Sequence, residues 1–202
     1  MNLKKIGEIL DKLNRVSLND AITNHEEILR RNFQHFMNNL TAEEIGFSKI
    51  PKFPPQNWFY YPIAETEVFT LAIFAIPSGM RLPFHDHPAM TVLCKPFLGE
   101  YKQFQVNRAS LTIHGVQTIR ANDDCHIVTS DSIHAIEAVT DSAFIDLVMP
   151  PYSEFRDQGR AISYFEEIDH GVIRRCNVPA SNKSVRFDTF YYDRCLAKLR
   201  LF

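Results

Sequence analysis

Apolar residues in the first fifty positions recur at steps of three and four, the spacing that places side chains on one face of a helix. Residues 23–26 have the sequence of a capping box, which predicts the start of a second helix, and residues 41–44 repeat this sequence before a short turn. A proline-rich stretch at 50–55 then stops helix formation. The first apolar stripe consists of Leu3, Ile6, Leu10 and Leu13.

From Trp58 onward, the pattern changes to short runs of β-branched and aromatic residues separated by turn residues. A spacing near ten residues without helical patterns between the runs indicates an antiparallel sandwich or barrel. We expect a mainly β domain over residues 51–202, with residues 1–50 packed on its outside as a helical arm in one structural unit. The expected strands cover residues 68–76, 91–106, 110–119, 125–129, 134–140, 143–149 and 185–192.

Composition and charge narrow the class of protein. Of 202 residues, 45% are apolar and 23% are charged, which excludes disordered, collagenous and coiled-coil proteins. The net charge of −2 argues against binding to nucleic acids or anionic membranes, because both require a basic surface. The longest apolar run, residues 68–77, is too short to cross a bilayer. We therefore expect neither a nucleic-acid nor a membrane partner.

Cysteine usage and the N-terminal segment predict the compartment. Residues 1–14 form an amphipathic polar helix without the unbroken apolar segment of a secretory signal. The four cysteines are widely spaced and include no CxxC pair, which favours free thiols in a reducing compartment. We expect a cytoplasmic protein, with a nuclear location left open. The cysteines are Cys94, Cys125, Cys176 and Cys195.

The strongest chemical signal is a pair of histidines, His85 and His87, shortly after the glycine turn at Gly79. Side chains on a strand repeat their direction every two residues, so both imidazoles project from one face and Asp86 points the other way. This pattern predicts a metal site that needs a third ligand. Among the other histidines, His25 and His35 lie on the arm and are expected to be exposed.

The third ligand stays open on spacing alone. His134 begins an alternating strand at a position resembling that of the pair, whereas His126 lies on the preceding strand and is not excluded. His114 fits better facing solvent or a partner strand, and His170 is a weaker candidate.

A wider comparison of motifs then favours one fold. The spacing of Gly79, His85, His87 and Gly99 resembles the first motif of the cupin superfamily. Val92 stands where that motif normally has a glutamate ligand, and the second cupin motif is reduced to its histidine, at position 134. A cupin that keeps three histidines is similar to the thiol dioxygenases.

Within that group, the chain resembles the cysteamine dioxygenase and plant cysteine oxidase family. The resemblance implies a cupin barrel (double-stranded β-helix, jelly-roll) with Fe(2+) bound by His85, His87 and His134, and it decides against His126. It also implies addition of both atoms of O2 to the sulfur of cysteamine, giving hypotaurine, or of an N-terminal cysteine, giving cysteine sulfinic acid. Oxygen sensing through N-degron formation would follow from the second reaction. The matching segments are residues 82–90, 132–139, 144–152, 159–160 and 163–165.

The chain departs from the family at Ile162, where animal and plant members commonly have a cysteine two residues before the tyrosine that corresponds to Tyr164. In animal members, these two residues can form a thioether, which Ile162 makes impossible here. Tyr164 remains a candidate catalytic residue as a hydrogen-bonding phenol. Three neutral imidazoles would leave the charge of iron uncompensated, and a cation stabilises a bound thiolate directly.

Asp146 lies in the predicted strand 143–149, whose two faces are both apolar, so its carboxylate requires a partner. It could orient an imidazole such as that of His134, or accept a hydrogen bond from the substrate's amine with Tyr152 closing the same wall. An ion pair with an arginine such as Arg160 is the third alternative. The apolar wall of the pocket is expected to come from Phe84, Leu93 and Phe104.

Two classes of function remain. The favoured one is an iron thiol dioxygenase, expected to be a monomer, that acts with O2 on an aminothiol or a Cys-initiated peptide. The alternative is a non-catalytic cupin that binds a metal or a small ligand in a regulatory role. The sequence does not distinguish cysteamine from N-terminal cysteine as the substrate.

Overall fold

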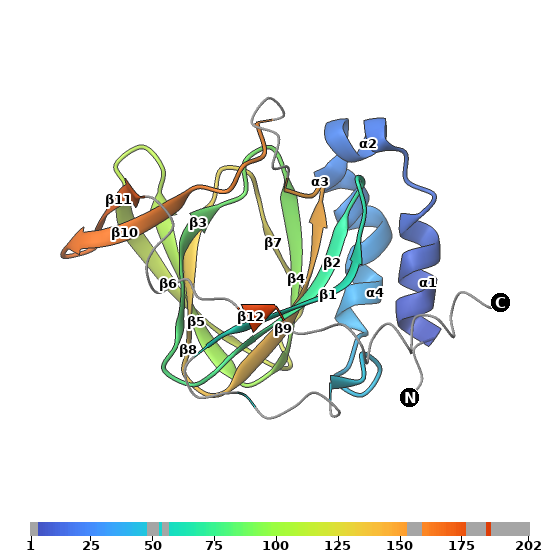
Figure 1. Cartoon of the computed structure of the whole chain (residues 1–202), viewed down its shortest axis with the longest axis horizontal. Coiled ribbons are helices and arrows are strands. Elements are labelled where there is room, and N and C mark those ends of the chain that lie inside the picture. The colour runs from blue at the N-terminus through green and yellow to red at the C-terminus, as the bar shows by residue number, and fades with distance from the viewer. Residues whose placement is uncertain (1–3, 48–52, 54–56, 153–158, 177–184, 187–202) are drawn as a thin grey trace.

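The computed structural model of the chain describes residues 4–47, 53, 57–152, 159–176 and 185–186. Within these residues, short helices come first and strands follow (Figure 1). None of the helices in the described part of the chain is long and apolar enough to span a membrane. The helical segments are α1 (Lys4–Leu13), α2 (Leu18–Thr23), α3 (His25–Ile28), the π-helical turn η1 (Leu29–Phe33) and α4 (Gln34–Asn38).

The strands form two sheets. One has the order β12-β1-β2-β9-β4-β7, and the other, β10-β11-β6-β5-β8-β3, closes on itself through the pairing of β10 with β3. This architecture confirms the predicted cupin barrel. The strands are β1 (Phe59–Glu65), β2 (Thr70–Ile76), β3 (Arg81–Asp86), β4 (Thr91–Leu98), β5 (Glu100–Asn107), β6 (Thr112–Arg120), β7 (His126–Val128), β8 (Ile133–Ala138), β9 (Ser142–Met149), β10 (Tyr164–Asp169), β11 (Val172–Cys176) and β12 (Val185–Arg186).

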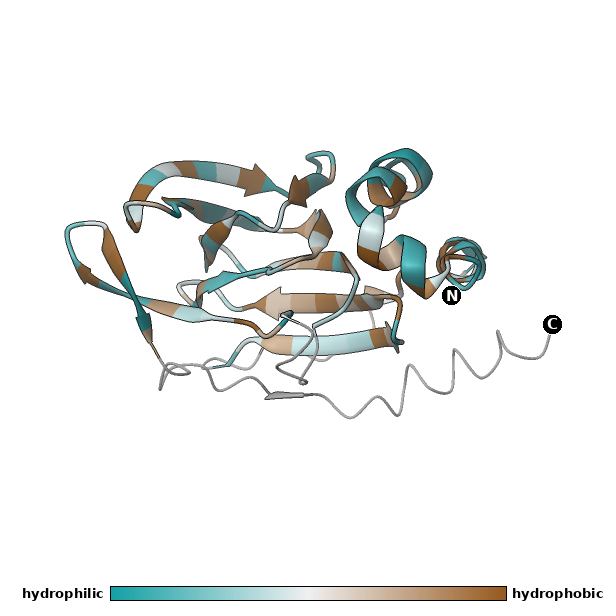
Figure 2. Ribbon diagram, turned by 90° about the horizontal axis from the view of Figure 1, so that it is seen from above, coloured by the Kyte–Doolittle hydropathy of each residue, from teal (hydrophilic) through white to brown (hydrophobic). Residues whose placement is uncertain are grey.

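The helices cover the outer face of the first sheet, and the β10–β11 hairpin lies at the opposite end of the barrel (Figures 1 and 2). One apolar core joins buried residues of the helices, such as Ile9 and Phe33, to outward-facing residues of β2 and β9, such as Ile73 and Leu147. The alternation of β9 is the reason: Ile145, Leu147 and Met149 belong to this core, and the residues between them face the barrel interior. β9 is therefore buried on both faces, as its sequence predicts.

A helix does begin within residues 23–26, because α3 starts at His25, but its N-cap is Asn24 and the predicted side-chain cap bond is missing. The residues before it form α2, which was not predicted. Its N-cap is Ser17, whose side chain accepts a hydrogen bond from the Asp20 amide, and α2 ends at Thr23. The Thr23 hydroxyl donates backward to the Asn19 carbonyl at 2.9 Å, so it cannot cap the next segment. The repeat at residues 41–44 does form the reciprocal capping bonds, in a short turn that follows α4.

The strands expected at 68–76, 110–119, 125–129, 134–140 and 143–149 correspond to β2, β6, β7, β8 and β9. The single strand expected at 91–106 is wrong, because Gly99, at φ 72°, divides it into β4 and β5. A Cβ at this position would collide with the Asp141 carbonyl, so the turn requires glycine. Of the strand expected at 185–192, only β12 lies within the described residues.

Two strands that were not predicted from the sequence, β1 and β3, each contain a proline. β1 contains Pro62 and β3 contains Pro83, and each strand has a register shift beside its proline. Proline donates no ladder hydrogen bond and occurs in strands mainly at edges and bulges, so it weakens a strand prediction. The hairpin of β10 and β11 was also not predicted. It belongs to the second sheet, and its Phe165 and Ile173 pack in one apolar cluster with Phe84 of β3.

Candidate metal centre

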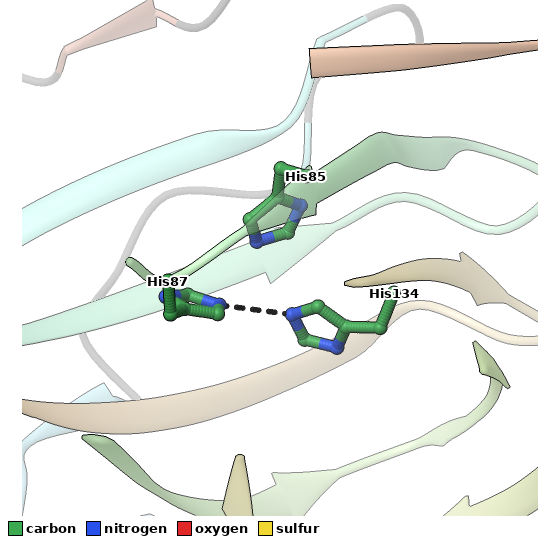
Figure 3. Close-up of side chains that lie close together, drawn as sticks. All are labelled: His85, His87 and His134. Atoms are coloured by element: carbon green, nitrogen blue, oxygen red, sulfur yellow. Dashed lines mark hydrogen bonds between the residues drawn. The ribbon is translucent and has the colours of Figure 1, made fainter. Parts of the chain in front are cut away.

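Three histidines converge inside the barrel: His85 on β3, His87 just after the end of β3, and His134 on the neighbouring β8 (Figure 3). β3 and β8 pair so that His85 lies directly opposite His134, and His87 follows two residues after His85 on the same side. The register shift between Leu82 and His85 adds one residue to β3, so that both of these residues reach the pocket. The bulge at Pro83 thus contributes to the position of the histidine pair.

The three rings are close enough to share one ion. Their potential ligand atoms all lie within 4.8 Å of one another, and His87 Nε2 is 3.0 Å from His134 Nε2. The ring centroid of His85 lies 4.9 Å from that of His87 and 4.6 Å from that of His134. Among the described residues, this is the one group of at least three histidine, cysteine or acidic side chains with a geometry that could hold a metal ion.

Hydrogen bonds at Nδ1 orient two of the rings. His85 Nδ1 is 2.9 Å from the Pro83 carbonyl, and His87 Nδ1 is 2.7 Å from the Tyr152 hydroxyl, which donates to the Asp86 carbonyl at 3.0 Å. Assigning the proton of each ring to Nδ1 satisfies these contacts and leaves Nε2 free as a lone-pair donor. For His134, Nδ1 is buried without a hydrogen-bond partner.

Burial also sets the charge of the site. Desolvation lowers the pKa of all three imidazoles, and the neighbouring rings lower those of His87 and His134 further. All three rings are therefore neutral near pH 7, which is the form that binds a metal ion. Neutral, converging nitrogen donors with space around them fit a transition metal ion with open coordination positions.

The other histidine candidates do not join this group. His126 faces Cys94 across the β7–β4 pairing, its Nε2 is buried without a partner, and burial lowers its pKa to about 4. The side chain of Asp86 points away from the centre, as its position between the histidines predicts. It accepts hydrogen bonds from the Ser163 amide at 2.9 Å and from Arg108 at 3.1 Å, linking the end of β3 to two other segments.

The histidines open onto a cavity of about 610 Å³ between the two sheets. The prediction that Phe84, Leu93 and Phe104 form the apolar wall of this cavity is wrong. Phe84 and Phe104 pack in the apolar cluster of the β10–β11 hairpin, and Leu93 packs in the core under the helices. Each of these side chains belongs to the outward-facing set of its strand, and the sequence alone did not fix which set that is. The apolar wall is formed instead by Trp58, Tyr60, Phe74, Leu82, Ile136 and Phe144.

Asp146 lies in this otherwise apolar wall. Its Oδ1 is buried without a hydrogen-bond partner, and burial raises the pKa of its carboxyl to about 7. The structure has no hydrogen bond from His134 to Asp146, and no ion pair of Asp146 occurs among the described residues. Its polar neighbour is Cys94, which lies directly opposite it in the β4–β9 pairing. Sequence reasoning missed Cys94, because only the β4–β9 pairing brings it to this position.

The two tyrosines occupy different positions around the site. Tyr152 contacts His87 directly through its hydroxyl. Tyr164 pairs with His85 in the β10–β3 register and lines the cavity beside Ile162, so the residue at position 162 brings no thiol to this wall.

Comparisons with known proteins agree with the motifs. A family model described as PCO_ADO matches residues 26–194. A probable 2-aminoethanethiol dioxygenase of Dictyostelium discoideum is 36% identical over 108 residues, covering 46% of this chain and 50% of that protein. Plant cysteine oxidase 1 of Arabidopsis thaliana is 23% identical over 158 residues, covering 66% of this chain and 53% of that protein. The chain thus spans about half the length of these relatives.

Among solved structures, a Klebsiella pneumoniae protein with a double-stranded β-helix domain aligns with a TM-score of 0.47 and 16% identity, over 59% of this chain and 94% of that one. The family model matches most of the chain, including all three histidines of the centre. The chain therefore belongs to the PCO_ADO family, the cysteamine dioxygenase and plant cysteine oxidase family that its motifs resemble.

Proposed function

We propose that this protein is an Fe(II)-dependent thiol dioxygenase that adds both atoms of dioxygen to the sulfur of an aminothiol, giving a sulfinate. His85, His87 and His134 would hold the Fe(2+) through Nε2. When bound, the iron supplies the redox chemistry that activates dioxygen towards sulfur. The observation that carries the proposal is the convergence of three neutral imidazoles, without a carboxylate in the group, on a cavity within a PCO_ADO chain.

The donor set favours thiol chemistry over the oxygenases with two histidines and one carboxylate. The nearest acidic residue in sequence, Asp86, is occupied by Ser163 and Arg108. Three neutral ligands leave the metal's positive charge uncompensated, and a positive charge lowers the pKa of a thiol that binds beside it. The role of the protein is then to hold the substrate's sulfur next to the centre and to exclude bulk water from it.

We assign Asp146 the recognition of the substrate's amine. Asp146 lines the cavity, its Oδ1 has no hydrogen-bond partner, and desolvation by the apolar surroundings disfavours its charged form. An ammonium group of the substrate would supply the missing donor and the opposite charge. Tyr152 would orient His87 through its hydroxyl, and Tyr164 would act as a phenol in the wall next to His85.

For the substrate, we propose cysteamine, the N-terminal cysteine of peptides, or both. Both carry an amine two carbons from the sulfur, and a cavity of about 610 Å³ has room for more than the smaller of them. The names of the relatives, 2-aminoethanethiol dioxygenase and plant cysteine oxidase, include both classes. Oxidation of an N-terminal cysteine would couple the lifetime of a target protein to oxygen through an N-degron.

The test is oxygen consumption by the iron-loaded protein with cysteamine, with a Cys-initiated peptide and with a thiol that lacks the amine, together with product mass spectra. The proposal expects a product heavier than the substrate by both atoms of dioxygen, with turnover lost in His134→Ala and retained in the matched control His126→Ala. Iron binding without oxygen consumption for any thiol would refute the enzyme and favour the non-catalytic cupin.

A further inference from the structure

Three polar side chains from three strands lie next to one another at the wall of the cavity: Asp146 on β9, Cys94 on β4 and Tyr101 on β5. The β4–β9 ladder pairs Cys94 directly with Asp146, and directly opposed residues hold their side chains next to each other on one face of a sheet. Tyr101 reaches across from the facing sheet, with its hydroxyl 3.7 Å from Cys94 Sγ. The thiol therefore lies between a phenol and the carboxyl of Asp146.

Mostly apolar residues surround these three side chains, so the thiol of Cys94 has few other polar groups near it. Cys94 is 2% exposed and Tyr101 is fully buried, and both belong to an apolar cluster with Leu82, Ile136 and Phe144. A thiol has one weak donor and a weak acceptor, whereas an ionised carboxylate can only accept. The consistent arrangement is donation from the Tyr101 hydroxyl to sulfur and from the thiol to Asp146. Burial raises the pKa of Cys94 and of Tyr101, so both groups keep their protons.

This contact matters because the rest of the wall holds the carboxyl only by packing. The torsion that turns a carboxyl group about its Cβ–Cγ bond is broad and has no sharp intrinsic preference. Oδ1 of Asp146 has no hydrogen-bond partner, and the thiol directly opposite in the β4–β9 ladder is the polar group placed to restrict this rotation by donating a hydrogen bond.

We propose that Cys94 is a positioning residue that, supported by Tyr101, donates a hydrogen bond to the Asp146 carboxyl and fixes its orientation towards the substrate's amine. The proposal rests on the proposed function, in which Asp146 receives that amine. Cys94 itself does not touch the substrate, and its thiol remains unchanged through the reaction.

Kinetics of two variants test the role. Cys94→Val removes the donor at similar volume, and Cys94→Ser keeps a donor. We expect the KM for an aminothiol to rise about tenfold in Cys94→Val with a smaller change in kcat, and to return to within about threefold of the original protein in Cys94→Ser. The KM for a thiol without an amine should not change. Cys125→Val is the matched control, since Cys125 is a buried thiol whose hydrogen bond goes to the Gln34 carbonyl, away from the cavity.

The infrared S–H stretching band of Cys94 reports the hydrogen bond between its thiol and Asp146, and its measurement does not require enzyme activity. The band of Cys94 is assigned by its loss in Cys94→Ser, and Asp146→Leu should move it to higher frequency by removing the acceptor. If iron-loaded original protein consumes no oxygen with any thiol, the proposed function fails, and a band that shifts in Asp146→Leu still supports the Cys94–Asp146 contact. A band that does not move, or an active enzyme whose aminothiol KM is unchanged in Cys94→Val, overturns the positioning role.

Discussion

The buried carboxyl of Asp146 should make the stability of the metal-free protein depend on pH in a direction opposite to that of most aspartates. Its pKa is raised from the ordinary value of 3.8 to about 7 in the folded protein, chiefly by desolvation. Between these two values the folded state binds more protons than the unfolded state, so the free energy of unfolding falls as pH rises from about 4 to about 7. This difference in pKa corresponds to about 4 kcal/mol of the free energy of unfolding, and this contribution is fully lost once the pH exceeds the pKa of the folded state.

Asp146→Asn keeps the shape of the side chain and removes its titration. We expect this variant to match the original protein near pH 4 and to exceed its free energy of unfolding by up to about 4 kcal/mol at pH 8. Urea unfolding at a series of pH values, in the presence of a chelator, measures the difference. The buried histidines titrate in both proteins, so their contribution cancels.

The same substitution at the exposed Asp131 is the matched control. Parallel stability curves for the original protein and Asp146→Asn would show that Asp146 is not desolvated in the folded state. That result would remove the electrostatic argument for its binding of an amine.

Three further predictions concern the metal centre and its neighbours. His134→Ala should lose bound iron, whereas His126→Ala should keep it, as measured by metal content after gel filtration; the opposite result would reassign the third ligand. Tyr152→Phe removes the hydrogen bond that orients a ligating imidazole and should weaken iron binding by roughly tenfold to a hundredfold in a chelator competition, and unchanged affinity would exclude that role. The peptide that contains Tyr164 should have its sequence mass, and its recovery joined to a cysteine-containing peptide, at the sum of the two masses less two hydrogens, would reveal a cross-link to a cysteine elsewhere in the chain.

Local alternation predicted much of the fold, and failed where the backbone is irregular. β2, β8 and β9 are uninterrupted, mostly apolar runs without glycine or proline, and their positions were predicted closely. β1 and β3 contain a proline beside a register shift, and Gly99 divides a continuous apolar run. Such irregularities interrupt the periodic signal on which a strand prediction depends.

Only some residues of the candidate site could be predicted from the sequence. The histidine pair and Asp146 could be identified locally, the pair by its two-residue spacing and Asp146 as a charge in an apolar strand. Cys94 could not, because its role depends on the pairing of β4 with β9, two strands far apart in the sequence. The apolar wall was assigned wrongly for a related reason, since the face of a strand that lines a cavity is fixed by the sheet around it.

The bulge at Pro83 connects these two observations. A shift of one residue in strand pairing moves every side chain of the strand to the opposite face. Leu82 lies opposite Ile136 and His85 opposite His134, so three steps along β3 correspond to two along β8. Without the extra residue, Leu82 and His85 would face opposite sides of the sheet, and either the apolar wall or the histidine pair would leave the cavity. The carbonyl of Pro83 also accepts the hydrogen bond from His85 Nδ1, so the residue that weakens the strand prediction orients one of the three imidazoles.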